Sequence, residues 1–228
     1  MKSDYLPYID YEFDQTGCTY KVNTDTVALG MFLDPMKHKS VLDIGTNSGA
    51  LLLYAHEKGA DKLIGVDIHE DALETAKKNL SSYSKDFELH HCKVQELSID
   101  PVDVVICNPP FFEMNNVTDD LYLKEAMFEE SLPLEELFAC FRKFMKANGE
   151  AYLIYQADRF PELYDACKTY KLKIMKMRFV HDISSKHALR ILVKLKIGPM
   201  SKLKILDPLM IDSGHFVKAQ YSEEKAIK

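Results

Sequence analysis

The segment SVLDIGTNSGALLLYAHEKG (residues 40–59) decides the fold class. Its first part, SVLDIG (40–45), predicts a buried strand, and GALLLYAHEKG (49–59) predicts a helix that ends at a glycine. The apolar run DKLIGVDI (61–68) predicts a second strand, and HEDALETAKKNLS (69–81) predicts an amphipathic helix with acids first and lysines later. A strand, a turn, a helix and a strand in this order are typical of a parallel α/β sheet.

The rest of the chain continues the alternation of strands and helices. We expect helices over 133–149 and 159–171 and further strands over 87–94, 101–108, 150–156, 172–181 and 188–198. The pattern predicts an α/β fold with a mostly parallel, seven-stranded sheet, and its last two strands form an antiparallel edge hairpin. We expect three parts: an N-terminal cap segment (1–35) over the ligand site, a catalytic domain (36–200) and a C-terminal extension (201–228).

The composition excludes several classes of protein. The chain has 228 residues, of which 46% are hydrophobic, and it lacks both a signal peptide and an apolar run of the ~18 residues that a membrane helix needs. The five cysteines are an odd number without a CxxC pair, so we expect reduced thiols rather than disulfides or a zinc site. These features predict a cytoplasmic protein without a metal.

Basic residues are concentrated in one segment. Residues 168–204 hold eleven Lys or Arg and one acid, Asp182, which gives +10 within a chain of net charge −6. The other 18 basic and 34 acidic residues give −16. A basic region on an acidic body is a candidate phosphate-binding face, and the alternative is a solvated face of strands and turns.

The turn DIGTNSGA (43–50) lies where open α/β sheets bind ligands, after the first strand. Gly45 allows the tight turn and Gly49 allows the helix to start close by, while Asn47 tolerates left-handed backbone geometry. The turn is not GxGxxG in register, and Asp43 would repel a pyrophosphate but attract an amino group. The turn therefore favours a ligand that carries an amine.

Asp67 stands 22 residues after Gly45, at the end of the second predicted strand. A carboxylate there accepts hydrogen bonds from ribose hydroxyls, and the alternative is a cap for the next helix. With this turn followed by Asp67, the chain resembles the S-adenosylmethionine-dependent methyltransferases of the Rossmann-like class. The resemblance covers roughly residues 20–200. The resemblance implies that Asp43 and the Gly45–Gly49 loop hold the methionine part of S-adenosyl-L-methionine, Asp67 the ribose, and Ile68 the adenine.

The third predicted strand departs from this pattern. The methyltransferases usually place an Asp after it, to contact the cofactor adenine. In this chain the position holds Lys93, preceded by Cys92.

The stretch VVICNPPFF (104–112) places two prolines and an aromatic ring at the end of the fourth predicted strand. Alone, it would be a proline-rich turn with fixed backbone angles. At this position Asn108-Pro109-Pro110-Phe111 resembles the (D/N/S)PP(Y/F) motif of methyltransferases that act on nitrogens conjugated to a π system. The resemblance implies that Asn108 contacts the cofactor and, with the Pro109 carbonyl, accepts the amine's hydrogens, and that Phe111 stacks on a flipped base.

The N-terminal stretch FDQTGCTYKVNTDTVALGMFL (13–33) indicates which amine the protein would methylate. It resembles the segment before the cofactor loop in the bacterial tRNA(Val) adenine-37 N(6)-methyltransferase family, with matches at Gln15, Tyr20, Thr24, Asp25 and Thr26. The resemblance implies a class I methyltransferase that modifies an adenosine 6-amino group in tRNA and releases S-adenosylhomocysteine. It also implies that Thr24 and Asp25 contact the cofactor, with a helix cap as their alternative, and that the basic segment Lys168–Lys204 holds RNA phosphates.

Other functions remain as alternatives. The motif also serves ribosomal RNA adenine or guanine amines, whereas release-factor methyltransferases need a long helical domain before the cofactor loop. The family loop after the motif usually holds an Ala-Arg-His-Glu-like stretch, and here it reads KEAMFEE (124–130). That difference and Lys93 leave open a catalytically silent cofactor- or RNA-binding module. A nicotinamide-dependent dehydrogenase would share Asp67 but leave the Asn-Pro-Pro-Phe motif unexplained.

Overall fold

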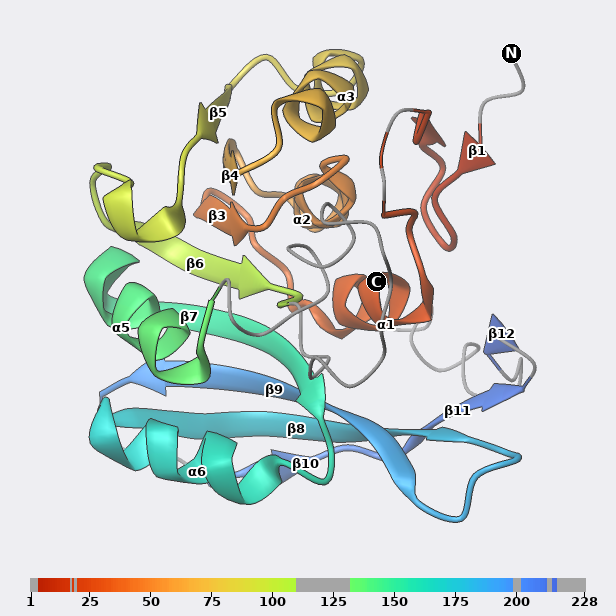
Figure 1. The fold of residues 1–228 in the computed structure, drawn as a ribbon, viewed down its shortest axis with the longest axis vertical. Helices are drawn as coiled ribbons and strands as arrows, with labels where there is room; N and C mark the ends of the chain where they lie inside the picture. The colour runs from red at the N-terminus through yellow and green to blue at the C-terminus, as the bar shows by residue number, and fades with distance from the viewer. Residues whose placement is uncertain are drawn as a thin grey trace, which may run out of the picture.

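The computed structural model describes residues 4–16, 18, 20–109, 132–198, 202–212 and 215–216. A ten-stranded sheet runs in the order β12-β11-β8-β9-β7-β6-β3-β4-β5, and β10 also pairs with β8 (Figure 1). Its strands are β3 (Ser40–Ile44), β4 (Lys62–Asp67), β5 (Phe87–His91), β6 (Val102–Cys107), β7 (Met145–Gln156), β8 (Leu172–Asp182), β9 (Ala188–Ile197), β10 (Lys204–Ile205), β11 (Leu209–Asp212) and β12 (His215–Phe216). A separate hairpin joins β1 (Asp4–Tyr5) and β2 (Glu12–Phe13).

Helices cover both faces of the sheet (Figure 1). One face packs against α1 (Thr24–Phe32), α2 (Ala50–Glu57) and α3 (Glu70–Ser81). The other packs against α5 (Leu134–Phe144) and α6 (Phe160–Thr169), with the short 3-10 helix η1 (Val94–Glu96) at its edge. Among the described residues, no helix is both long and apolar enough to cross a bilayer.

The central strand β3 shows why the sheet is buried. Leu42 and Ile44 belong to the apolar cluster on one face, and Val41 belongs to the cluster on the other. Side chains alternate between the faces of a strand, so a strand covered on both sides is mostly apolar, and the buried Asp43 is an exception in β3. β3 pairs in parallel with both β4 and β6, and the chain order reverses between β3 and β6. Ligands bind at such a switch point, outside the carboxyl ends of the strands.

The antiparallel hairpin predicted near the C-terminus is present as β8 and β9. β9 inserts between β7 and β8 and runs antiparallel to both, so β8 runs in the same direction as β7. The seven long strands are those predicted from the sequence, and three short strands from residues 204–216 extend the sheet beyond β8. These strands have two to four residues each, which is too short to produce a recognisable alternation.

The helix predicted over 133–149 is shorter in the structure. α5 ends at Phe144, and β7 starts at the next residue, because Met145 already pairs with Val102 of β6. The pairing register shifts between Val102 and Val104, where β7 resumes at Glu150. Asn148 and Gly149, which the sequence suggests as the end of this helix, therefore lie in an irregular part of β7.

Candidate active site

Three neighbouring strands bring the predicted site residues to one edge of the sheet. β4, β3 and β6 are adjacent and parallel, and Ile44 pairs with both Val66 and Cys107. The Asp43–Gly49 loop, Asp67 and Asn108 therefore lie at the carboxyl ends of three consecutive strands. The site is assembled by the sheet register.

The loop after β3 has the backbone geometry that its sequence predicts. Gly45, Asn47 and Gly49 all have positive φ, at 71°, 47° and 81°. A Cβ added to Gly45 would meet nothing within 4 Å, whereas one on Gly49 would lie 3.3 Å from the Ala76 Cβ. Gly49 thus lets α2 begin close to α3, and Gly45 exposes its backbone to open space beside the strand ends.

Asp43 is a buried acid with an incomplete set of hydrogen bonds. Its side chain is only 1% exposed, and its Oδ2 accepts a hydrogen bond from the Thr46 hydroxyl at 2.9 Å. Its Oδ1 has no hydrogen-bond partner among the described residues. Burial raises the pKa of Asp43 to about 8, Thr46 opposes the shift, and the nearby Asp67 adds to it. A carboxylate oxygen left without a donor fits a ligand that supplies an ammonium group.

Asp67 connects the loop after β3 to the start of α3. Its Oδ2 accepts the Asn47 backbone N–H at 2.8 Å, and its Oδ1 accepts the His69 backbone N–H at 3.0 Å. Burial raises the pKa of Asp67, and these two hydrogen bonds oppose the rise. Each carboxylate oxygen has a second acceptor site, so Asp67 serves the local structure and still has capacity for ligand hydroxyls.

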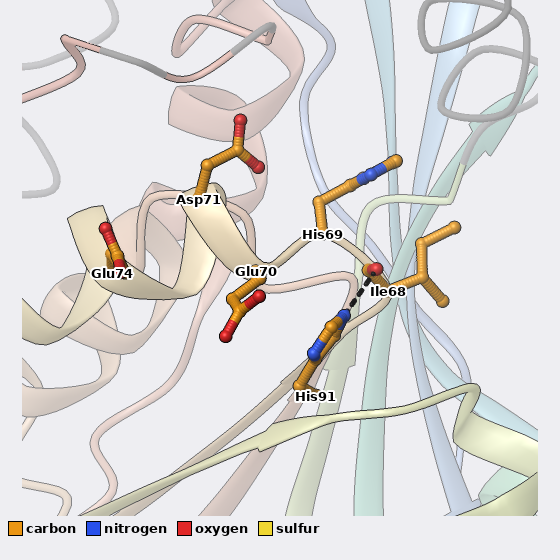
Figure 2. Close-up of a pocket in the computed structure, with 6 residues that line it drawn as sticks. All are labelled: Ile68, His69, Glu70, Asp71, Glu74 and His91. Atoms are coloured by element: carbon orange, nitrogen blue, oxygen red, sulfur yellow. Dashed lines mark hydrogen bonds between the residues drawn. The ribbon is translucent and has the colours of Figure 1, made fainter.

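A shallow hollow beside Asp67 begins at Ile68. It is lined by Ile68, His69, Glu70, Asp71, Glu74 and His91. Figure 2 shows the three acids on α3 and His91 on β5, whose Nε2 is hydrogen-bonded to the Ile68 carbonyl oxygen at 2.9 Å. Ile68 is 37% exposed and offers an apolar surface to a flat ring. Sequence reasoning identified Ile68 but not the acids, because a helix's first acidic turn is expected in any amphipathic helix.

Asn108 follows β6 and contacts the N-terminal segment. Its side-chain Nδ2 donates a hydrogen bond to the Thr26 hydroxyl oxygen at 3.3 Å. Pro109 is buried beside it. Pro110, Phe111 and the loop KEAMFEE (124–130) lie outside the described residues.

Thr24 and Asp25, which were predicted to contact the cofactor, lie in the first turn of α1. Asn23, rather than Thr24 or Asp25, is the N-cap of α1, and Thr24 is the first helical residue. The Asp25 carboxylate forms an ion pair with Arg190 of β9 at 2.9 Å, with both side chains mostly buried. Asp25 therefore anchors α1 to the sheet, and sequence reasoning missed Arg190 because it lies 165 residues away.

The N-terminal segment also contacts the loop after β3 and the helices that follow it. The Asn47 side chain donates to the Tyr20 carbonyl oxygen at 2.8 Å. Asn79 of α3 exchanges hydrogen bonds of 2.8 Å with the backbone of Asp14, and Tyr11 stacks on Tyr83. Asn47 thus has a second function, besides its left-handed geometry, that the turn pattern did not reveal.

The basic segment Lys168–Lys204 is divided in the structure. Lys176 and Lys194 both pair with Asp34, and Lys194 also pairs with Glu150. Burial alone would raise the pKa of Asp34, but hydrogen bonds from the two ammonium groups hold it at about 2. With the Arg190–Asp25 and Lys168–Asp165 pairs, at least four of the eleven basic side chains form ion pairs within the described part of the chain.

Two other basic residues of the segment, Lys173 and Lys186, lie at opposite ends of the strands. Lys173 is near the start of β8, at the edge away from Asn108, whereas Lys186 is in the turn between β8 and β9, at the same edge as Asn108. The segment therefore does not form one continuous basic face. Within the part of the chain that is described, no group of three or more His, Cys, Asp or Glu is placed to hold a metal.

The sheet order, the glycine loop and the strand-end acid and amide define a class I methyltransferase fold. Residues 35–196 match the family model for a methyltransferase domain. A tRNA1(Val) (adenine(37)-N6)-methyltransferase from Porphyromonas gingivalis is 29% identical over 84% of this chain and 80% of its own. One of the same name from Christiangramia forsetii is 30% identical over 68% of each chain. The chain therefore belongs to the methyltransferase domain family and, within it, to the tRNA1(Val) (adenine(37)-N6)-methyltransferase family.

Solved structures agree at the level of the fold. A predicted O-methyltransferase from Agrobacterium tumefaciens superposes with a TM-score of 0.64 and 17% identity, and covers 90% of this chain and 96% of that one. Identity this low indicates a shared fold and does not identify a substrate.

Proposed function

We propose that this enzyme transfers the methyl group of S-adenosyl-L-methionine to the 6-amino group of adenosine 37, beside the anticodon of tRNA(Val). The observation that carries the proposal is the position of Asn108-Pro109 at the end of β6, adjacent to the Asp43–Gly49 loop. The names of the two relatives support the substrate. Because tRNA is the substrate, we also assign the enzyme to the cytoplasm.

The cofactor, when bound, supplies an activated methyl group on a sulfonium. The Asp43 carboxylate and the open backbone at Gly45 would hold its amino-acid part. Asp67 would accept hydrogen bonds from the ribose hydroxyls, and Ile68 would pack against the adenine. Asp25, paired with Arg190, and Thr24 would support this site through the position of α1 rather than through a charge on the cofactor.

Asn108 and Pro109 would prepare the target nitrogen for reaction. An exocyclic amine is a weak nucleophile, because its lone pair is delocalised into the aromatic ring. The Asn108 Oδ1 and the Pro109 carbonyl oxygen would accept its two hydrogens and direct the lone pair at the methyl group. The fixed φ of proline holds the acceptors in place before the reaction, so little reorganisation is needed. Phe111 would stack on the flipped base, and the proton would leave to solvent after transfer.

The domain division and the RNA contacts belong to the same proposal. The cap segment (1–35) would close the cofactor site, and its contacts with the loop after β3 and with α3 support this role. The catalytic domain would comprise 36–200, and the C-terminal extension (201–228) would add short strands to its edge. Within the basic segment, Lys186 lies at the edge where tRNA phosphates would approach, and binding there would weaken with added salt.

The test is methyl transfer from labelled S-adenosyl-L-methionine to unmodified tRNA(Val), and separately to ribosomal RNA, followed by nucleoside digestion. We expect N(6)-methyladenosine from tRNA(Val), and none from a tRNA(Val) with guanosine at position 37. Formation of N(2)-methylguanosine in ribosomal RNA would support methylation of an exocyclic amine but would refute tRNA(Val) as the substrate. Cofactor binding without transfer to any RNA would overturn the proposal and favour a silent binding module.

A further inference from the structure

The carboxamide of Asn108 can face its surroundings in two orientations, and only one of them suits the reaction. With Oδ1 toward the target amine, Asn108 accepts a hydrogen bond. With Nδ2 toward it, two hydrogens meet two hydrogens, and the amine is neither held nor directed. The described structure provides a contact that distinguishes these orientations, and this contact lies outside the motif itself.

A series of three hydrogen bonds runs from Asn23, the N-cap of α1, through Thr26 to Asn108. The Thr26 backbone N–H donates to the Asn23 Oδ1 at 3.0 Å, and the Thr26 hydroxyl lies 3.1 Å from the same oxygen. The Asn108 Nδ2 lies 3.3 Å from the Thr26 Oγ1. Among the described residues, Thr26 is the hydrogen-bond partner of the Asn108 side chain.

The direction of each bond follows from the one before it. A backbone N–H only donates, so the Asn23 atom that it meets must be the carbonyl oxygen. That oxygen only accepts, so the Thr26 hydroxyl directs its single proton toward it. The Thr26 oxygen is then left as an acceptor, and Asn108 must present its NH₂ group to it. The Asn108 Oδ1 consequently faces away from Thr26.

We propose that Asn23 and Thr26 are positioning residues that fix the orientation of the Asn108 carboxamide through this hydrogen-bond relay, so that Oδ1 is presented to the target amine. The inference rests on the proposed function, because it assigns a role toward the amine that Asn108 would bind. On this proposal, the first turn of α1 positions Asn108 for the reaction, in addition to its proposed role in closing the cofactor site. The Asp25–Arg190 ion pair supports the relay, since it fixes the first turn of α1 to β9.

The first test substitutes Thr26. Thr26→Val keeps the shape of the side chain and removes its hydroxyl, and Thr26→Ser keeps the hydroxyl. We expect Thr26→Val to lower kcat by about 10-fold or more, with little change in KM for tRNA or in Kd for the cofactor, and Thr26→Ser to retain most of the activity. Thr169→Val on α6, an exposed threonine far from Asn108 in sequence, is the matched control and should behave as wild type.

The second test substitutes the cap. Asn23→Gly removes the acceptor at a small cost to the helix, whereas Asn23→Asp keeps both the cap and the acceptor. In Asn23→Gly the Thr26 hydroxyl is free to donate to the Asn108 Oδ1, which favours the unproductive orientation. We expect a reduced kcat for Asn23→Gly and near wild-type kcat for Asn23→Asp.

The possible outcomes separate this inference from the proposed function. Thr26→Val with wild-type kcat, or Thr26→Ser as impaired as Thr26→Val, would overturn the relay while leaving the activity established. A loss of cofactor binding that parallels the loss of kcat would assign Thr26 a structural role and would also overturn it. If the wild-type enzyme and the Thr169→Val control methylate no RNA, both the proposed function and the relay fail.

Discussion

Two buried acids and one half-buried acid in the structure have different surroundings. Asp43 and Asp67, at the ends of β3 and β4, face no basic side chain in any described ion pair, and burial raises the pKa of both. Asp34 lies between Lys176 and Lys194, and hydrogen bonds from these lysines lower its pKa to about 2 against the effect of burial. A buried acid without a cation retains unused capacity for a ligand, whereas a half-buried acid between two lysines is already compensated. Substitutions at Asp43 and Asp67 should change binding and catalysis, and substitutions at Asp34 should change stability.

The largest effect is expected for Asn108→Ala, at the edge that holds Asp43 and Asp67. The variant lacks an acceptor for the target amine, so methyl transfer should fall by about 100-fold or more. Cofactor affinity and the thermal midpoint should stay close to wild type, because Asn108 is only partly buried and its described bond is to Thr26. Kinetics together with isothermal titration of the cofactor check this expectation. Weaker cofactor binding with an unchanged kcat would refute the role of Asn108.

Asp67→Ala tests whether the acid after β4 is more than a helix cap. The variant removes charge-assisted hydrogen bonds to the ribose, and cofactor binding should weaken by about 1.5–3 kcal/mol. Because Asp67 also holds the Asn47 and His69 backbone, the thermal midpoint should decrease as well. Asp67→Asn is the matched control for size. An unchanged cofactor Kd in titrations of Asp67→Ala would show that Asp67 only caps α3.

The same substitution, Asp→Asn, should have opposite effects on stability at Asp34 and at Asp43. Asp34→Asn removes the charge between two lysines and should destabilise the protein by about 1–2 kcal/mol near neutral pH, a value reduced because Asp34 is 37% exposed. Asp43→Asn replaces a buried carboxyl group that must take up a proton on folding, because its pKa is raised to about 8, and should raise the thermal midpoint of the ligand-free protein while weakening cofactor binding. A decrease in thermal midpoint for both variants would contradict the distinction.

The Asp34 and Asp43 carboxyl groups should affect the pH dependence of stability in opposite directions. The pKa of Asp34 is lowered in the folded protein, so its contribution is present above the unfolded value of 3.8 and is lost as pH falls toward about 2. The pKa of Asp43 is raised to about 8, so its ionisation destabilises the folded state increasingly as pH rises from 3.8 to 8. The rise in thermal midpoint caused by Asp43→Asn should therefore be largest near pH 8 and absent near pH 4, as thermal unfolding at several pH values would show.

The smallest effect is expected for an exposed ion pair. Asp165→Ala breaks the pair with Lys168 on α6, where both side chains are mostly solvated, and the free energy of unfolding should stay within the error of the measurement. Denaturant titration at low and high salt checks this expectation. A loss comparable to that of Asp34→Asn would mean that burial does not separate the two kinds of pair.

The elements and the turn chemistry were predictable because they depend on neighbouring residues. The seven long strands, the helices between them and the left-handed positions Gly45, Asn47 and Gly49 follow from local apolar patterns and from backbone sterics. The placement of the three strand ends at one edge follows from parallel pairing. The end of α5 was not predictable, because Met145 leaves the helix to pair with Val102, about forty residues earlier.

The sequence by itself determined the class of sheet, the glycine loop after β3 and the Asn-Pro pair at the end of β6, since each depends on consecutive residues. Only the tertiary structure decided which charges are free and which are paired. Lys176 and Lys194 meet Asp34 across more than 140 residues, and Asn108 meets Thr26 across 82. Such contacts depend on how distant segments pack around one sheet, and no local pattern records which side chains then lie within hydrogen-bonding distance.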